Sequence, residues 1–466
     1  MGHATDSASD DGPSLRSLSQ AFRASQKLKW LLFAALLTAF GWDTLKTSLD
    51  DVERNYTELS ASDWEQTNVW LKSTACARET GVWLVVCGDD GKLIPIAEEA
   101  LGDDPGHALL LDIWAIASGQ TASFVDVARL NIMLNGLGFV LLASFLFAIR
   151  AYVCALVFLY LGPVVYLKWI GVSPHWALIG AASMAAVLPM ALLARELRFL
   201  SPRLATIYVG LGLLGLAMAS LIREAIGLMG IVTTLAVMVF LMLRRRQEDR
   251  PIRGTLVVAL LAVAAYAMAY LPSATRDAVF EIEAGQRVGR HGFSDILYMG
   301  LGAVPNAFGI AYDDNVALAN AQKIDPDVIH CSADFFRIMW RLYLEIVLNE
   351  PEEVARIYVE KAKIILSDPI VDPAPPLGVI LAFGLGHFVV ATALGLWRRV
   401  RFAPGALVEG AALVFIGLFV AQGILASPAR GYAMPAGAAI LTLIGILLGF
   451  FVRSAWAYAK PILARR

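Results

Sequence analysis

Runs of about 20 apolar residues recur along this chain and leave it few ways to fold. A helix rises about 1.5 Å per residue, so such a run crosses the roughly 30 Å of hydrocarbon in a bilayer. Hydrophobic residues make up 58% of the 466 residues and charged residues only 17%, unlike a soluble domain. The net charge of −2 gives no support to nucleic-acid binding. We therefore predict an all-α polytopic membrane protein.

About ten transmembrane helices are expected, each at one of the apolar runs. The expected spans lie near residues 28–43, 130–149, 151–170, 175–194, 204–222, 224–243, 254–272, 376–396, 404–426 and 435–455. The chain then divides into a disordered N-terminus (1–27), a first span (28–43), a first loop (44–128), six spans (130–272), a second loop (273–375), three spans (376–455) and a tail (456–466).

Basic residues collect in the N-terminus, the short loops and the tail, as in Arg244-Arg245-Arg246 and Arg398-Arg399. With ten spans, all of these segments fall on one side of the membrane. Short basic loops stay in the cytoplasm, so both termini are predicted to be cytoplasmic and both long loops to lie on the outer face. The expected location is a bacterial inner membrane. The first apolar run has no small-residue cleavage site after it and is interpreted as a retained anchor.

The first loop contains a predicted β-hairpin with an Asp90-Gly91 turn. Cys76 and Cys87 flank its first strand, and an oxidising compartment would favour a disulfide between them. The alternative is a pair of reduced, buried thiols.

The second loop is predicted to be mostly helical and to carry a small number of amphipathic helices. Apolar residues recur at helical spacing from Ser332 to Leu348, and a new helix is expected at Pro351. These helices are expected to lie on the membrane surface or to cap the bundle. They are interpreted as scaffolding.

Chemistry is sought in three polar clusters of the outer loops, because no motif of a soluble enzyme is present. The first cluster is Trp42-Asp43, at the predicted exit of the first span. A carboxylate at the membrane boundary could meet the phosphate of a lipid while partly desolvated. The alternative is an interfacial tryptophan anchor beside a solvated carboxylate.

The second cluster is Asp103-Asp104-Pro105-Gly106-His107. Two carboxylates beside a Pro-Gly turn and an imidazole favour a general base, or a site for Mg²⁺ or Mn²⁺ at Asp103 and Asp104. The alternative is an acidic turn that caps a helix from His107 to Ser118.

The third cluster lies in a segment of the second loop that is rich in glycine, proline and aromatic residues. Arg287, Arg290 and His291 could hold a phosphate or pyrophosphate. Tyr312, Asp313 and Asp314 follow and are predicted to bind substrate. The alternative is a turn-rich connector between surface helices.

The order of these features resembles that of the GT-C superfamily of membrane glycosyltransferases. The similarity covers the anchor, the loop bearing Trp42-Asp43 and Asp103-Asp104, and the entry to the second span at Ala128-Arg129-Leu130-Asn131. It implies transfer of a sugar from a polyprenyl-phosphate carrier to an acceptor on the outer face. It also implies a carboxylate base, either Asp43 or Asp104, often beside a divalent cation. No acidic-plus-aromatic motif follows the first span, and the C-terminal half lacks a large soluble domain.

Two other functions stay open at this stage. A non-catalytic membrane subunit would dock a partner membrane protein on its outer loops, with the helices at 332–366 as the interface. A transporter would need a polar tunnel, and the scarcity of charges inside the spans disfavours it.

Overall fold

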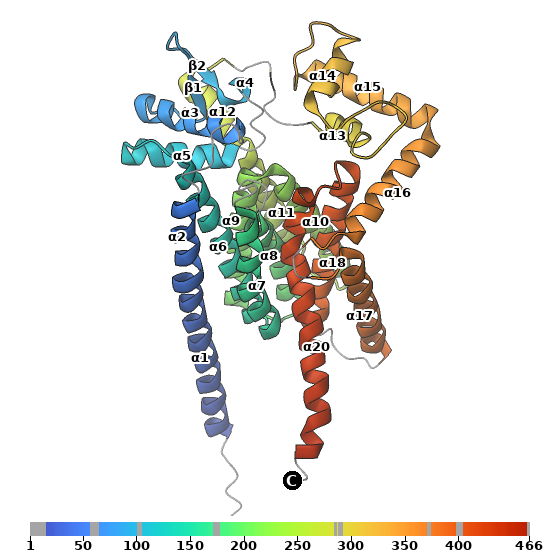
Figure 1. Ribbon diagram of the computed structural model, residues 1–466. Helices are drawn as coiled ribbons and strands as arrows, with labels where there is room; N and C mark the ends of the chain where they lie inside the picture. The colour runs from blue at the N-terminus through green and yellow to red at the C-terminus, as the bar shows by residue number, and fades with distance from the viewer. Residues whose placement is uncertain are drawn as a thin grey trace, which may run out of the picture.

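The computed structural model describes residues 15–55, 65–99, 105–170, 178–283, 287, 292–370, 374–397 and 404–463. Within this part of the chain, helices form a bundle that carries two lobes at one end (Figure 1). The described strands make one two-stranded sheet in the first lobe. The predicted all-α membrane architecture is confirmed at this level.

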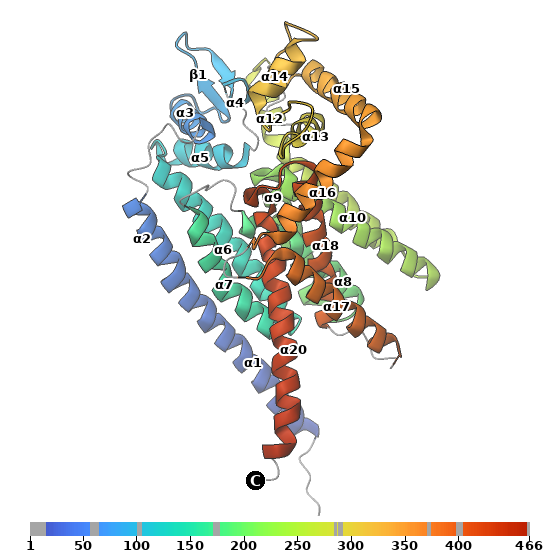
Figure 2. The same ribbon diagram turned by 45° about the vertical axis from the view of Figure 1, so that its right-hand side comes forward.

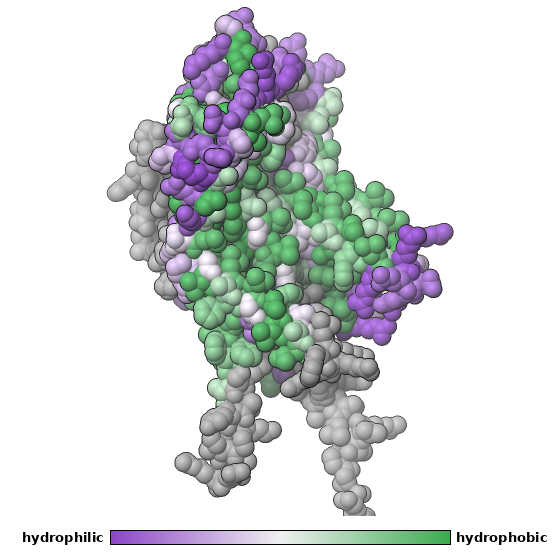
Figure 3. All heavy atoms as spheres, turned by 90° about the vertical axis from the view of Figure 1, so that its right-hand side faces the viewer, coloured by the Kyte–Doolittle hydropathy of each residue, from purple (hydrophilic) through white to green (hydrophobic). Residues whose placement is uncertain are grey.

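Seven of the described helices contain a stretch long and apolar enough to span a membrane. They are α6 (Phe124–Ala148), α8 (Ile179–Glu196), α9 (Pro202–Ile222), α10 (Glu224–Gln247), α17 (Leu377–Trp397), α18 (Pro404–Leu425) and α20 (Gly437–Leu463). An eighth span results if α11 (Arg253–Tyr266), η3 (Ala267–Ala269) and α12 (Leu271–Phe280), bent by 63°, count as one. The total of ten stays a prediction. Apolar residues also dominate the middle of the face seen in Figure 3, below a hydrophilic end.

The first helix is longer than expected at both ends. α1 (Leu15–Ala39) continues through a π-helix, η1 (Phe40–Leu45), into α2 (Lys46–Asn55). The helix therefore begins inside the segment expected to be disordered, and it does not end at Asp43. Leu45 and Leu49 pack against the core of the bundle, so the continued helix buries apolar side chains that an exit at Asp43 would leave exposed.

The first lobe comprises residues 65–118 and confirms the predicted hairpin and disulfide. Its elements are α3 (Glu65–Thr80), β1 (Val85–Cys87), β2 (Leu93–Pro95), α4 (Ile96–Glu99) and α5 (Pro105–Ser118). The strands are antiparallel with Val86 opposite Ile94, and Cys76 is bonded to Cys87. Gly91 closes the turn at φ 77°, a conformation that favours glycine.

The second lobe comprises residues 292–370 and is helical, as predicted. Its helices are α13 (Phe293–Gly300), α14 (Asp314–Gln322), α15 (Ala333–Asn349) and α16 (Pro351–Ser367). The Ser332 hydroxyl caps α15 by accepting from the backbone N–H of Phe335. Both lobes lie at the end of the bundle opposite Leu15 of α1 and Leu463 of α20 (Figures 1 and 2). The two long loops thus share one end of the molecule.

The bundle is centred on α8, which packs against α6, α9 and α10 and is buried along most of its length. α17 lies at the periphery and exposes most of its surface. A polar pair links it to α18, where His387 Nδ1 lies 2.8 Å from Oε1 of the fully buried Glu409. Inside a span, each group of such a pair takes the place of water as the partner of the other. The pair therefore helps to hold α17, which is weakly packed, against α18.

Candidate functional site

Four predicted site residues, Asp103, Asp104, Arg290 and His291, lie outside the described residues. Their roles stay predictions, as does a Mg²⁺ or Mn²⁺ site at the Asp pair. Among the residues that the structure does describe, no group of three or more His, Cys, Asp or Glu side chains could hold a metal ion.

Asp43 lies in the π-helix η1, and its side chain is exposed. Its backbone carbonyl accepts from the N–H of Lys46, which continues the helix. Single turns of π-helix are rare and occur frequently at functional sites. The local backbone therefore sets this carboxylate apart from those on the ordinary helix that follows.

The level of Asp43 along the bundle follows from its neighbour Leu45. A Cβ added at Gly136 would meet the Leu45 side chain at 2.8 Å, so the two residues are in contact. Gly136 is the middle residue of α6, about 18 Å from either end of that helix. Asp43 is thus an exposed carboxylate level with the middle of α6, and the helix continues past it to Asn55, where the sequence predicted an exit from the span. Ionisable groups in the middle of a membrane span are costly and are commonly functional.

His107 is enclosed by the first lobe and by the ends of α6 and α9 that meet this lobe. Its ring stacks on Trp70 with centroids 4.8 Å apart, and its Nε2 donates to Asn131 Oδ1 at 2.7 Å. The pKa of His107 is lowered to about 4, mainly by burial; the hydrogen bond to Asn131 acts to raise it and the charge of Arg223 to lower it. The ring is 1% exposed, so direct contact with a ligand would require this stack to open.

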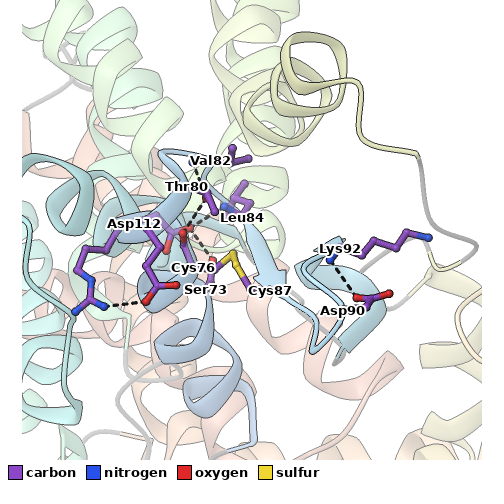
Figure 4. Close-up of a disulfide and its surroundings, with 11 residues drawn as sticks. Ser73, Cys76, Thr80, Val82, Leu84, Cys87, Asp90, Lys92 and Asp112 are labelled. Carbon is purple, nitrogen blue, oxygen red and sulfur yellow. Dashed lines mark hydrogen bonds and ion pairs between the residues drawn. A yellow bond between two sulfur atoms is a disulfide. The ribbon is translucent and has the colours of Figure 1, made fainter.

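Asp112, which the sequence analysis did not select, is fully buried beneath the hairpin (Figure 4). Its Oδ2 accepts from the Ser73 hydroxyl at 2.8 Å and from the backbone N–H of Leu84 at 2.7 Å. Oδ1 is buried without a hydrogen-bond partner. Burial raises the pKa of Asp112 to about 7, while both hydrogen bonds act to lower it. A single acid within the apolar sequence Leu109 to Trp114 was the available signal.

The start of the second loop binds the first lobe through polar contacts. Arg276 of α12 donates to the Leu84 carbonyl, and the indole N–H of Trp83 donates to the Pro272 carbonyl at 3.2 Å. The predicted phosphate ligand Arg287 is half-buried, and its backbone N–H donates to Glu98 Oε1 at 2.6 Å. These contacts position the chain immediately before Arg290 and His291 beside the first lobe.

Tyr312 and Asp314 belong to a cluster that also contains Asp295 and Tyr432. Tyr312 donates its hydroxyl hydrogen to Tyr432 Oη at 2.7 Å, which joins the second lobe to α19 (Arg430–Ala433) between α18 and α20. Burial raises the pKa of Tyr312, and Tyr432, Asp314 and Asp295 raise it further. The cluster therefore combines neutral phenols with nearby carboxylates. The sequence analysis missed Asp295 and Tyr432, which are distant in the chain.

Asp313 has a structural task in this conformation. Its side chain caps α14 by accepting from the backbone N–H groups of Asn315 at 2.8 Å and Val316 at 3.2 Å. An N-cap of this kind satisfies backbone donors that the helix itself leaves unpaired. The predicted role of Asp313 in substrate binding is not tested by this contact.

A further acidic group, Glu224, lies at the start of α10 close to the lobes. It accepts from the hydroxyls of Tyr266, at 3.0 Å, and Tyr270. These tyrosines flank the bend between α11 and α12, so the carboxylate links that bend to the end of the bundle. Sequence reasoning missed this group because 42 residues separate Glu224 from Tyr266.

No family model matches the chain, and no curated protein or solved structure is significantly similar to it. The π-helix of Asp43 packs against α6, whereas the Tyr312 cluster contacts α19, which follows α18.

Proposed function

We propose that this chain is a glycosyltransferase-like membrane enzyme that transfers a sugar from a polyprenyl-phosphate carrier to an acceptor on the outer face. The observation that carries the proposal is the exposed carboxylate of Asp43 on a π-helix that is level with the middle of α6. A long lipid chain requires access from the bilayer, and an exposed group on the first helix is open to it. One end of the molecule is hydrophilic above the apolar middle of the bundle (Figure 3).

In the proposed step, the Asp43 carboxylate takes the proton of an acceptor hydroxyl. The acceptor oxygen then bonds to the anomeric carbon of the sugar, and the bond from that carbon to the phosphate oxygen breaks. The lipid phosphate leaves with the electron pair. Where Asp104 is the base, Arg290 or His291 would stabilise that phosphate. A divalent cation would add positive charge at the phosphate, with Asp103 and Asp104 as its proposed ligands. Asp104 is the alternative base.

The test uses the full-length protein in liposomes that contain radiolabelled polyprenyl-phosphate sugars and a panel of hydroxyl acceptors. Loss of a general base should lower kcat about 100-fold or more in Asp43→Asn. Asp50→Asn is the matched control, because Asp50 is exposed two turns further along the same continuous helix. It should retain activity within about twofold, as expected for a surface change far from the chemistry.

If Asp43→Asn keeps full activity and Asp104→Asn loses it, the general base is Asp104 and not Asp43. Full activity in both variants would exclude carboxylate catalysis by either residue. A wild-type protein that transfers no sugar from the panel would overturn the enzyme proposal in favour of the second function.

That second function is a membrane subunit whose second lobe docks a partner protein. It is favoured by exposed apolar side chains on α15, where Trp340 is 41% exposed and Leu348 is 78% exposed. Exposed apolar groups gathered on one helix are typical of interaction surfaces. Purification from mild detergent should then recover a stoichiometric partner, and Trp340→Glu should release it while the bundle stays folded.

A further inference from the structure

An apolar groove runs between α1 and the hairpin formed by α6 and α7 (Tyr152–Ile170), at the end of the bundle away from the lobes. Its volume is about 170 Å³. One charged residue, Lys29, contributes to the lining, and the others are Leu32, Phe33, Leu36, Phe147, Tyr152 and Leu156. The wall of the groove is therefore almost entirely apolar, and Lys29 lines it at the Tyr152 end.

Aromatic contacts hold the two walls of the groove together. Phe33 of α1 stacks on Phe147 of α6 with centroids 4.2 Å apart, and Trp30 contacts the same ring edge-on at 4.9 Å. Phe147 also meets Tyr152 of α7 at 4.9 Å. Since three helices share one aromatic cluster, the groove is a formed feature of the fold and its walls are preorganised for a ligand.

The cationic end of the groove has a defined position. Lys29 Nζ lies 5.5 Å from the centroid of the Tyr152 ring, within the range of a cation–π contact. Lys29 is exposed, so its ammonium stays available to an anion. Arg150, in the turn between α6 and α7, is also exposed and adds a second positive charge two residues before Tyr152. An anionic headgroup is the complement of this end.

We propose that the groove binds an anionic phospholipid, with an acyl chain along the apolar wall and the phosphate at Lys29. A water-soluble anion would gain nothing from the apolar wall, and an uncharged chain would leave the two cations without a counter-charge. A lipid with a net negative headgroup matches both parts. The proposal is independent of the proposed enzyme activity, since the groove lies at the opposite end of α6 from the lobes.

The experiment titrates the purified full-length protein in detergent with phosphatidylglycerol or phosphatidylcholine of identical chains. Bound lipid is counted by native mass spectrometry, and the Tm is followed in parallel because a ligand of the folded state raises it. Phosphatidylglycerol should bind more tightly than phosphatidylcholine. Lys29→Gln should lower the affinity for phosphatidylglycerol about fivefold, as expected for one basic side chain near an anionic surface. The affinity for phosphatidylcholine should stay unchanged.

Lys27→Gln is the matched control, because Lys27 is exposed on the same helix and does not line the groove. It should keep the wild-type preference. Leu36→Trp should fill the groove and weaken both lipids, with a lipid-free Tm equal to that of the wild type as the check on folding. Equal affinity for both lipids, or equal effects of Lys29→Gln and Lys27→Gln, would overturn the proposal. Wild-type lipid binding in Leu36→Trp would do so as well.

Discussion

The two lobes share one end of the bundle but are attached to it in different ways. The apolar core of the first lobe continues into the bundle, because Val69, Trp70 and Leu109 cluster with Val127 of α6 and Leu221 of α9. The second lobe has a core of its own, formed by α13 to α16 and their connections. The first lobe is thus an extension of the bundle. The second is a unit with its own core, joined to the bundle through α16, which places Ile365 in the bundle core and makes polar contacts beside it.

One buried lysine supplies the central contact of the second lobe. Lys361 of α16 donates to the carbonyls of Gly300, Leu425 and Ala426 at 2.8, 3.1 and 2.7 Å. Burial lowers the pKa of Lys361 to about 7, while two of these carbonyls belong to the carboxyl end of α18, where a cation is stabilised. A Cβ at Gly300 would meet the Leu425 carbonyl at 2.2 Å, so this approach requires glycine.

The largest expected effect follows from removing that ammonium group. Lys361→Met should destabilise the attachment of the second lobe by about 3–5 kcal/mol, because three buried carbonyls lose their donor. Hydrogen exchange should then accelerate in residues 292–370 and stay slow in residues 65–99. Lys363→Met, an exposed change on the same helix, is the control. Equal exchange in the two variants would mean that apolar packing alone holds the second lobe.

A somewhat smaller effect is expected when the covalent link of the first lobe is removed. The Cys76–Cys87 bond closes a loop with a sequence separation of 11, and losing it should cost about 3 kcal/mol in Cys76→Ser/Cys87→Ser. Faster exchange should appear in β1 and β2, with α15 unchanged. Wild-type protein treated with a reductant should match the double variant. If α15 responds as strongly as the hairpin, the two lobes unfold together and the contrast between them is wrong.

Local signals in the sequence predicted much of both lobes. The Asp90-Gly91 turn, the spacing of Cys76 and Cys87, and the helix starts at Ser332 and Pro351 each depend on a few neighbouring residues. Their outcome depends little on the rest of the fold, which is why the hairpin, the disulfide and both long helices of the second lobe were predicted.

Contacts between distant segments were not predictable in this way. Lys361 follows Glu360 and precedes Lys363, a pattern typical of a solvated face, and only the approach of α18 buries it. The helix continues past Asp43 because Leu45 and Leu49 find partners on the bundle. The sequence therefore predicted the end of the first helix at Asp43, whereas the helix continues to Asn55.

The smallest expected effect is a pH dependence of stability that is confined to the first lobe. It would sharpen the contrast between the two lobes. Asp112 has a raised pKa of about 7, so it contributes stability below pH 3.8 that is lost as the pH rises towards 7. His107 has a lowered pKa of about 4, so its contribution is present above pH 6.5 and is lost as the pH falls towards 4. The two slopes oppose each other over the same interval and should nearly cancel in the wild type.

Asp112→Asn should remove one slope and leave stability rising by about 2–3 kcal/mol between pH 4 and 6.5. Exchange in β1 and β2 measured across this interval tests the balance, with α15 as the internal reference. A flat profile in Asp112→Asn would show that His107 is not held neutral by its burial against Trp70, and the first lobe would then lack the opposing pair of buried titratable groups.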